Sequence, residues 1–216
     1  IRLADRWKPN WVVIENVSGL AQTEKGIFLK MILESLKEIG YTCAFKLLNA
    51  VEYGVPQKRE RLFIVGSMNG IEFNFPERLS YKVTVREALL DLPELENGSQ
   101  FNSLAYKELP NSVYAKQMRN GAKLSLNNYV TRNNDLVIER YKHIPQGKNW
   151  ASIPDELMGN YKDKSRCHGG IYYRLREDEP SVVIGNYRKN MLIHPTQNRG
   201  LSVREAARIQ SFPVWF

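Results

Sequence analysis

The 216-residue sequence lacks the features that define several broad classes of protein. No apolar run approaches the roughly 18 residues that a membrane helix needs, and the chain does not open with a basic segment followed by an apolar one. Its two cysteines, Cys43 and Cys167, lie far apart and neither belongs to a Cys-x-x-Cys pair. We therefore expect neither a membrane protein nor a disulfide scaffold, but a cytosolic or nuclear protein.

Metal-ligand patterns are also lacking. Cys167 adjoins His168, but His143 and His194 have no ligand spacing with that pair, so we expect no metal site. Cys43 lies inside a strand-like segment, where a small buried apolar residue is expected rather than a nucleophile.

Positive charge is abundant. The net charge is +8 and the pI is about 9.4, with most of the excess between Leu104 and Gly200. Such a balance favours polyanionic partners such as nucleic acid, although a basic surface that serves only solubility is the alternative. Because the sequence starts at Ile1 without Met and opens in what looks like mid-helix, we expect it to be a piece of a larger protein.

The first part of the chain has the pattern of an α/β fold. Trp11–Ile14 is a continuous apolar run typical of a buried parallel strand, and a helix from about Gly26 to Ile39 and a strand from Tyr41 to Leu48 follow. Ligands of open α/β sheets bind beyond the carboxyl ends of strands, which makes Glu15 a candidate catalytic residue. The alternative is a carboxylate that caps the next turn.

The stretch from Tyr53 to Arg61 leads into a predicted strand, Leu62–Gly66. After a Gly-Val-Pro turn, Gln57, Arg59 and Arg61 follow at every second position, which would place them on one face. One amide and two guanidinium groups suit a phosphate, a carboxylate or the edge of a base. Solvated side chains at a strand entry are the alternative.

The remainder is predicted to hold short helices and a mostly β subdomain. Capping boxes at Thr84 with Glu87 and at Ser202 with Glu205 mark two helix starts. Further helices are expected at Ser112–Met118 and Asp135–His143, and short strands at Ile171–Leu175 and Ser181–Ile184. Glu94–Asn134 otherwise has weak periodicity.

Basic residues interleaved with aromatics and glycines occupy the stretch from Lys148 through the loop Tyr161–Gly170. This composition suits contacts with phosphates and bases, with solvated loops as the alternative. The candidate nucleic-acid-binding residues are Lys148, Lys164, Arg166, His168 and Arg174. Arg204 and Arg208, four residues apart on the last helix, are expected to join two domains rather than touch a substrate.

Three segments stand in a fixed order: Glu15-Asn16-Val17, Gln57-x-Arg59-x-Arg61, and Arg204-Glu205-Ala206-Ala207-Arg208-Ile209-Gln210-Ser211-Phe212-Pro213. This set resembles the C-terminal part of the DNA cytosine-5 methyltransferase family over nearly the whole chain. The resemblance implies part of a Rossmann-like methyltransferase sheet in residues 1–78, a mostly β target recognition domain in 79–190, and a linking helix in 191–216. It gives Asn16, Gln57, Arg204 and Arg208 structural roles.

The chemistry of that family gives the candidate catalytic residues their roles. A cysteine thiolate adds to C6 of a flipped cytosine, and C5 then attacks the methyl group of S-adenosylmethionine. The resemblance implies that Glu15 bonds to N3 and the exocyclic amine, that Arg61 bonds to O2, and that Arg59 supports the pocket. It also implies double-stranded DNA as the partner and a cytoplasmic, nucleoid-associated enzyme of a bacterial restriction-modification system.

The sequence departs from the family pattern in three places. No cysteine follows a proline, and the glycine-rich cofactor motif and the closing helix are missing. We therefore expect no cofactor-binding residue here, a missing N-terminal part of the same enzyme that supplies the rest, and no activity of this chain alone. A non-catalytic DNA-binding subunit or a decayed homologue is the alternative, and an RNA substrate is disfavoured because the long basic insert suits duplex DNA.

Overall fold

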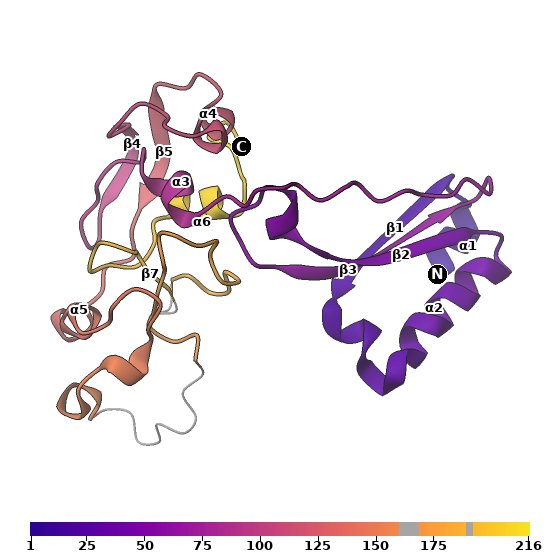
Figure 1. Cartoon of the computed structure of the whole chain (residues 1–216), viewed down its shortest axis with the longest axis horizontal. Helices are drawn as coiled ribbons and strands as arrows, with labels where there is room; N and C mark the ends of the chain where they lie inside the picture. Colours follow the sequence, from indigo (N-terminus) through magenta and orange to yellow (C-terminus); the bar gives the residue numbers. More distant parts are fainter. Residues whose placement is uncertain (160–168, 189–191) are drawn as a thin grey trace. The chain divides into compact units, whose positions relative to one another are not determined.

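The computed structural model describes residues 1–159, 169–188 and 192–216 (Figure 1). The chain forms two compact units. Unit 1 comprises Ile1–Tyr53 and Arg59–Ser80, and unit 2 comprises Gly54–Lys58 and Tyr81–Phe216. Each unit has its own apolar core.

Unit 1 is a three-stranded sheet covered on one face by a helix. The strands are β1 (Trp11–Val17), β2 (Thr42–Asn49) and β3 (Glu60–Ser67), in the order β1-β3-β2, with β3 antiparallel to both neighbours. Helix α2 (Ile27–Glu38) packs Leu36 against Leu62 and Ile64 of β3 (Figure 1). Helix α1 (Arg2–Trp7) and three 3-10 helices complete the unit: Ser18–Ala21, Thr23–Gly26 and Ala50–Tyr53.

The first strand differs from the expectation of a buried parallel strand. β1 pairs antiparallel with β3, and its side chains alternate between the core and solvent. Val12 and Ile14 pack into the core beneath α2, whereas Trp11 and Val13 are 43% and 64% exposed. The continuous apolar run therefore did not indicate a parallel strand buried on both faces. Within the described residues, only one face of β1 is well covered.

Unit 2 is mixed α and β: it has short strands, as the sequence predicted, and also several short helices. β4 (Gln100–Ala105) and β5 (Leu124–Tyr129) pair antiparallel, and β6 (Tyr173–Arg174) and β7 (Leu192–Ile193) form a short parallel pair. The helices are α3 (Val85–Leu89), α4 (Val113–Arg119), α5 (Asp135–Lys142) and α6 (Val203–Ile209), with 3-10 helices at Trp150–Ser152 and Asp155–Met158. α6 contacts both β5 and α3.

Local sequence signals explain where α3 and α6 begin. Both predicted capping boxes are confirmed, Thr84 with Glu87 and Ser202 with Glu205. Residues 192–216 lie in the same compact unit as residues 81–188, whereas the sequence suggested a separate linking segment. The segment Gly54–Lys58 also belongs to unit 2, because Ser181 exchanges backbone hydrogen bonds with Pro56 and Lys58.

Candidate functional site

Glu15 and Arg61 meet on neighbouring strands of unit 1. Glu15 lies on β1 and Arg61 on β3, and Arg61 Nε is 2.8 Å from Glu15 Oε1. The Arg61 side chain is 20% exposed and that of Glu15 is 47% exposed, so the pair is open to a ligand on one side. Arg61 Nη1 donates to the carbonyl of Glu60, and Nη2 has no partner among the described residues. The pair can therefore offer an acceptor and a donor side by side.

The neighbouring motif residues have different surroundings. The backbone of Arg59 is held by Asn49, whose Oδ1 accepts the Arg59 N–H at 3.1 Å. No described residue lies within hydrogen-bonding distance of the Arg59 guanidinium. Asn16 turns its Oδ1 back to the N–H of Val17 at 2.8 Å, which shapes the chain where β1 ends.

Gln57 is buried in unit 2, whereas Arg59 and Arg61 belong to unit 1. Gln57 is 1% exposed and forms a backbone bridge with Ser181. Its side-chain Oε1 and Nε2 are both buried and have no hydrogen-bond partner in the described structure. An unpaired buried amide is costly, so this side chain is a position where a further polar group would be stabilising.

Arg174 does not have the surroundings expected of a DNA-binding residue. It is 6% exposed, and burial lowers the pKa of its guanidinium. Its five N–H groups point inward, to the carbonyls of Tyr141, Ile144, His194 and Gln197 and to Asn198 Oδ1. No donor is left for a phosphate, so the geometry favours a structural role.

The other candidate DNA-binding residues divide into two groups. Lys148 is exposed at the start of its loop, and its backbone pairs with that of Arg174. Lys164, Arg166 and His168 lie outside the described residues.

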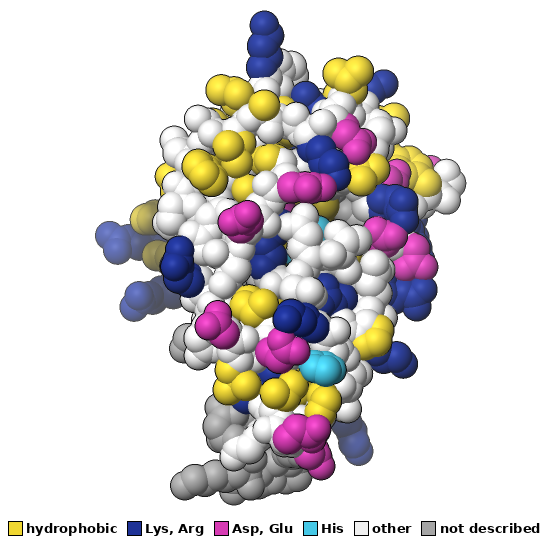
Figure 2. Space-filling view, turned by 90° about the vertical axis from the view of Figure 1, so that its left-hand side faces the viewer, with side chains coloured by type: hydrophobic (Ala, Val, Ile, Leu, Met, Phe, Trp, Pro, Cys, Tyr) yellow, Lys and Arg dark blue, Asp and Glu magenta, His cyan; other side chains and the backbone are white. Residues whose placement is uncertain are grey.

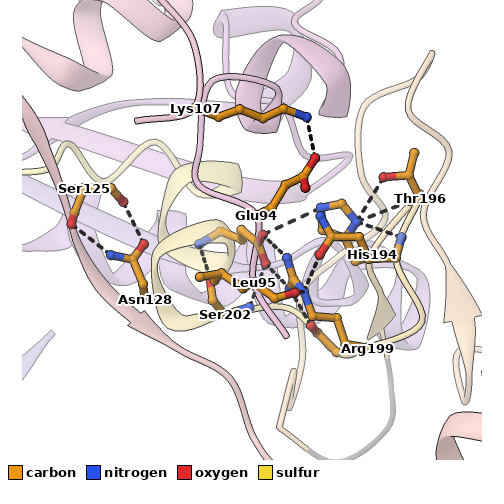
Figure 3. Close-up of polar contacts among 12 residues, drawn as sticks. Glu94, Leu95, Lys107, Ser125, Asn128, His194, Thr196, Arg199 and Ser202 are labelled. Carbon is orange, nitrogen blue, oxygen red and sulfur yellow. Dashed lines mark hydrogen bonds and ion pairs between the residues drawn. The ribbon is translucent and has the colours of Figure 1, made fainter. Parts of the chain in front are cut away.

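A buried charged cluster that the sequence did not reveal surrounds His194 (Figure 3). His194 Nδ1 accepts hydrogen bonds from the backbone N–H groups of Thr196 and Gln197, each at 3.2 Å. These bonds leave the proton on Nε2, which lies 3.6 Å from Glu205 Oε1. Arg199 binds both carboxylate oxygens of Glu205, at 2.7 and 2.8 Å.

Burial sets the protonation states of this cluster. It lowers the pKa of His194 to about 4, despite the opposing effect of Glu205. Burial alone would raise the pKa of Glu205, but the charge and hydrogen bonds of Arg199, with smaller contributions from His194 and the Ser202 N–H, lower it to about 2. The imidazole is therefore neutral and the carboxylate ionised at neutral pH. The sequence His-Pro-Thr-Gln alone did not predict that the backbone N–H groups of Thr196 and Gln197 would donate to the His194 ring.

Arg204 and Arg208 both hold α6 in place within unit 2. Arg204 donates to the carbonyls of Leu126 and Pro213 at 2.8 and 3.1 Å. Arg208 donates to Asp91 at 3.2 Å, and Arg119 lies on the other side of this fully buried carboxylate. Both arginines are almost completely buried, and these partners all belong to unit 2, whereas the sequence analysis expected the two arginines to join two domains.

Other chemistries find little support. No group of His, Cys, Asp or Glu that could hold a metal ion occurs among the described residues. Burial raises the pKa of the Cys43 thiol, which disfavours the thiolate form. In the described parts of the chain, no helix is long and apolar enough to cross a membrane.

The fold is that of a DNA methyltransferase. A solved structure described as a DNA modification methyltransferase encoded within a prophage (E. coli) matches with a TM-score of 0.73 at 20% identity, over 99% of this chain and 62% of that one. The family model for C-5 cytosine-specific DNA methylases matches residues 1–216. The chain therefore belongs to the C-5 cytosine-specific DNA methylase family, as its three ordered motifs predicted.

The relatives include bacterial and plant proteins. Type II methyltransferase M1.HphI of Haemophilus parahaemolyticus is 32% identical over 99% of this chain and 50% of its own length, and M.DdeI of Desulfomicrobium norvegicum is 28% identical over 99% and 55%. DNA (cytosine-5)-methyltransferase 1A of Oryza sativa is 28% identical over 99% of this chain and 17% of its own length. The chain thus spans about half the length of the bacterial relatives.

Proposed function

We propose that this chain is the C-terminal part of a DNA (cytosine-5)-methyltransferase of a bacterial restriction-modification system. The complete enzyme transfers a methyl group from S-adenosylmethionine to C5 of a cytosine flipped out of double-stranded DNA. The contact between Glu15 and Arg61 is the observation that carries this proposal.

The pair matches the edge of a cytosine. Charge develops on the ring when a nucleophile adds to C6, and donors fixed toward that charge lower the barrier. The free Nη2 of Arg61 donates to O2, and the Glu15 carboxyl group bonds to N3 and the exocyclic amine. The contact between the two side chains orients both before the base arrives. Arg59, two residues before Arg61 in the sequence, supports the pocket.

The cofactor is not held by this chain. In the described part of unit 1, no strand is followed by a glycine-rich turn that would bring backbone N–H groups to the cofactor, and β1 and β2 lead instead into 3-10 helices. These residues do not fit S-adenosylmethionine, so its site and the nucleophile belong to the upstream part of the same enzyme. Exposed Trp11 and Val13 on the uncovered face of β1 suit burial by that part.

A non-catalytic DNA-binding subunit is the second candidate function. The buried arginines that brace unit 2 would be needed both in the enzyme and in a DNA-binding subunit, since they stabilise unit 2 without touching the base. The Glu15–Arg61 pair favours the enzyme, because a subunit that only binds DNA needs no acceptor and donor fixed together on a sheet.

Substitution of the pair in the enzyme completed with its upstream part tests the proposal. Glu15→Gln and Arg61→Lys are each expected to lower methyl transfer by about 10²- to 10³-fold and to leave duplex binding unchanged. Glu34→Gln is the matched control, because Glu34 is an exposed carboxylate on α2 that pairs only with Lys30 at 3.6 Å. A normal transfer rate in Glu15→Gln would refute the assignment.

A further inference from the structure

Almost every described arginine of unit 2 is occupied by an internal partner. Each donates to a carboxylate or to a backbone carbonyl of the same unit, which leaves little of its guanidinium for a ligand. These residues are Arg86, Arg119, Arg140, Arg174, Arg176, Arg199, Arg204 and Arg208. Figure 2 shows basic and acidic side chains interspersed over one face, so charge alone does not mark a binding surface.

Arg132 and Arg188 are the exceptions in the described part of this unit. Neither has a carboxylate or carbonyl partner there, although Arg188 lies 5.9 Å from the ring of Tyr187. Both are exposed. The Tyr187 ring packs partly against the main core of unit 2, which fixes the backbone from which Arg188 projects. The Arg132 side chain lies against Gly98, where an added Cβ would be 2.8 Å from its Nε.

The two free arginines flank the same end of the β4–β5 pair. Gln100 and Tyr129 are opposite each other in the register at that end. They line an open groove of about 350 Å³ together with Thr131, Tyr187 and Arg188. Arg132 lines a second groove with Asn97 and Asp135, and it follows Thr131 of the first groove by one position in the sequence. The first groove thus combines the Arg188 guanidinium, the Gln100 side-chain oxygen, a hydroxyl and two phenols with the apolar side chains of Val130 and Val203, while Gln100 Nε2 donates to the carbonyls of Gly98 and Val130. The second groove offers mainly charge and small polar groups.

This division matches the two kinds of contact that duplex DNA offers. Base edges are read by fixed donors and acceptors, with arginine favouring the O6 and N7 atoms of guanine, whereas phosphates need only positive charge. An acidic protein surface would also attract free arginines, but it gives no reason for the phenols and the amide beside Arg188. The family membership favours DNA as the occupant.

We propose that the groove between Gln100, Tyr129 and Arg188 reads a base pair of the target sequence, with Arg188 contacting guanine and Arg132 holding a neighbouring phosphate. This inference rests on the proposed function, and it assigns the sequence-reading contacts to residues different from Lys148 and Arg174. Because Arg188 needs its planar fork, lysine cannot replace it, whereas lysine can replace Arg132.

Binding selection from a random duplex library by the enzyme completed with its upstream part first defines the preferred sequence, and salt-dependent titrations of variants follow. Arg188→Ala and Arg188→Lys are each expected to reduce the preference at one G·C pair by about tenfold or more. Arg132→Ala is expected to weaken binding to all sequences and to reduce the salt slope by about one, and Arg132→Lys to restore both.

Arg176→Ala is the matched control, because Arg176 is an exposed arginine already paired with Asp178 at 2.7 Å. Thermal melting verifies that each variant is folded. The inference is overturned if Arg188 variants bind like Arg176→Ala, if Arg188→Lys restores the preference, or if the completed wild-type enzyme binds DNA without preference. Absence of any DNA binding and methyl transfer by the completed wild-type enzyme would instead refute the proposed function as well.

Discussion

At the scale of single residues, His194 is held neutral by its neighbours. Its Nδ1 accepts two backbone hydrogen bonds that a second proton would break, and its pKa falls to about 4. An unfolded histidine titrates near pH 6.5. Since the folded state binds this proton less readily, the stability from neutral His194 is complete above pH 6.5 and is lost as the pH falls toward 4.

We expect this linkage to remove up to about 3 kcal/mol from the free energy of unfolding. Urea denaturation at several pH values between 7.5 and 4.5 measures it, since the stability from Glu205, whose pKa is lowered to about 2, is lost only below about pH 4.5. His194→Asn keeps an acceptor for the Thr196 N–H but cannot titrate, so its pH dependence should be flatter.

His143→Asn is the control for this prediction, because His143 is exposed and pairs only with Glu139 at 3.7 Å. The same pH dependence in His194→Asn and in the wild-type chain would contradict the role given to His194.

Residue roles could be predicted where a motif fixed the chemistry. The Glu-Asn-Val and Gln-x-Arg-x-Arg motifs picked out Glu15 and Arg61, which the fold brings within 2.8 Å of each other, although their catalytic role stays a prediction. Arg174 shows the limit. A basic residue between aromatics suggests a ligand contact, but its place beneath the carbonyls of Tyr141 and Ile144 depends on segments about 30 residues earlier in the sequence.

At the scale of elements, α6 is anchored by a buried ion pair. Asp91 is fully buried, and burial raises the pKa of its carboxyl group against the opposing effects of Arg208 and Arg119. Arg208→Met leaves this carboxylate with Arg119 alone at 3.5 Å. We expect a loss of about 3–5 kcal/mol in the free energy of unfolding, because a buried charge without a good partner is costly.

A second substitution separates charge from packing. Asp91→Leu combined with Arg208→Met removes both charges and should recover a large part of the loss. Arg176→Met, which breaks an exposed pair, should cost no more than about 1 kcal/mol. Urea denaturation of the three variants is the measurement, and equal losses in Arg208→Met and Arg176→Met would contradict the anchoring role.

Elements were predictable where local chemistry defined them. The capping boxes gave the starts of α3 and α6, and apolar spacing gave α2. β4 and β5 were missed because polarity does not follow burial along these strands: apolar Phe101 and Leu124 are exposed, whereas polar Ser125 and Asn128 are buried. The antiparallel direction of β1 could not be predicted from its own sequence either, since it depends on pairing with β3, about 50 residues away.

At the scale of the whole molecule, one sequence motif is divided between two compact units. Gln57 is paired with Ser181 in unit 2, while Arg59 and Arg61 continue into the sheet of unit 1. The spacing of two residues predicted that the three side chains share one face. Side chains alternate in this way only within one continuous strand, and here the backbone pairs with Ser181 at Gln57 and with the sheet of unit 1 from β3 onward. The three-part functional division stays a prediction, and by its contacts the chain forms two compact units.

The exposed apolar face of β1, the unpaired amide of Gln57 and the net charge of +8 all suit a chain that works together with other partners. Because the chain spans about half the length of its bacterial relatives, we attribute cofactor binding and nucleophilic attack to the other half. Under the proposed function, this half contributes the Glu15–Arg61 pair and unit 2.

Transfer of a radiolabelled methyl group from S-adenosylmethionine to duplex DNA is the most direct test of that division. The account predicts no transfer by this chain alone and transfer after the upstream half is added. Turnover by the isolated chain, or no turnover by the two halves together although they bind each other and DNA, would contradict it.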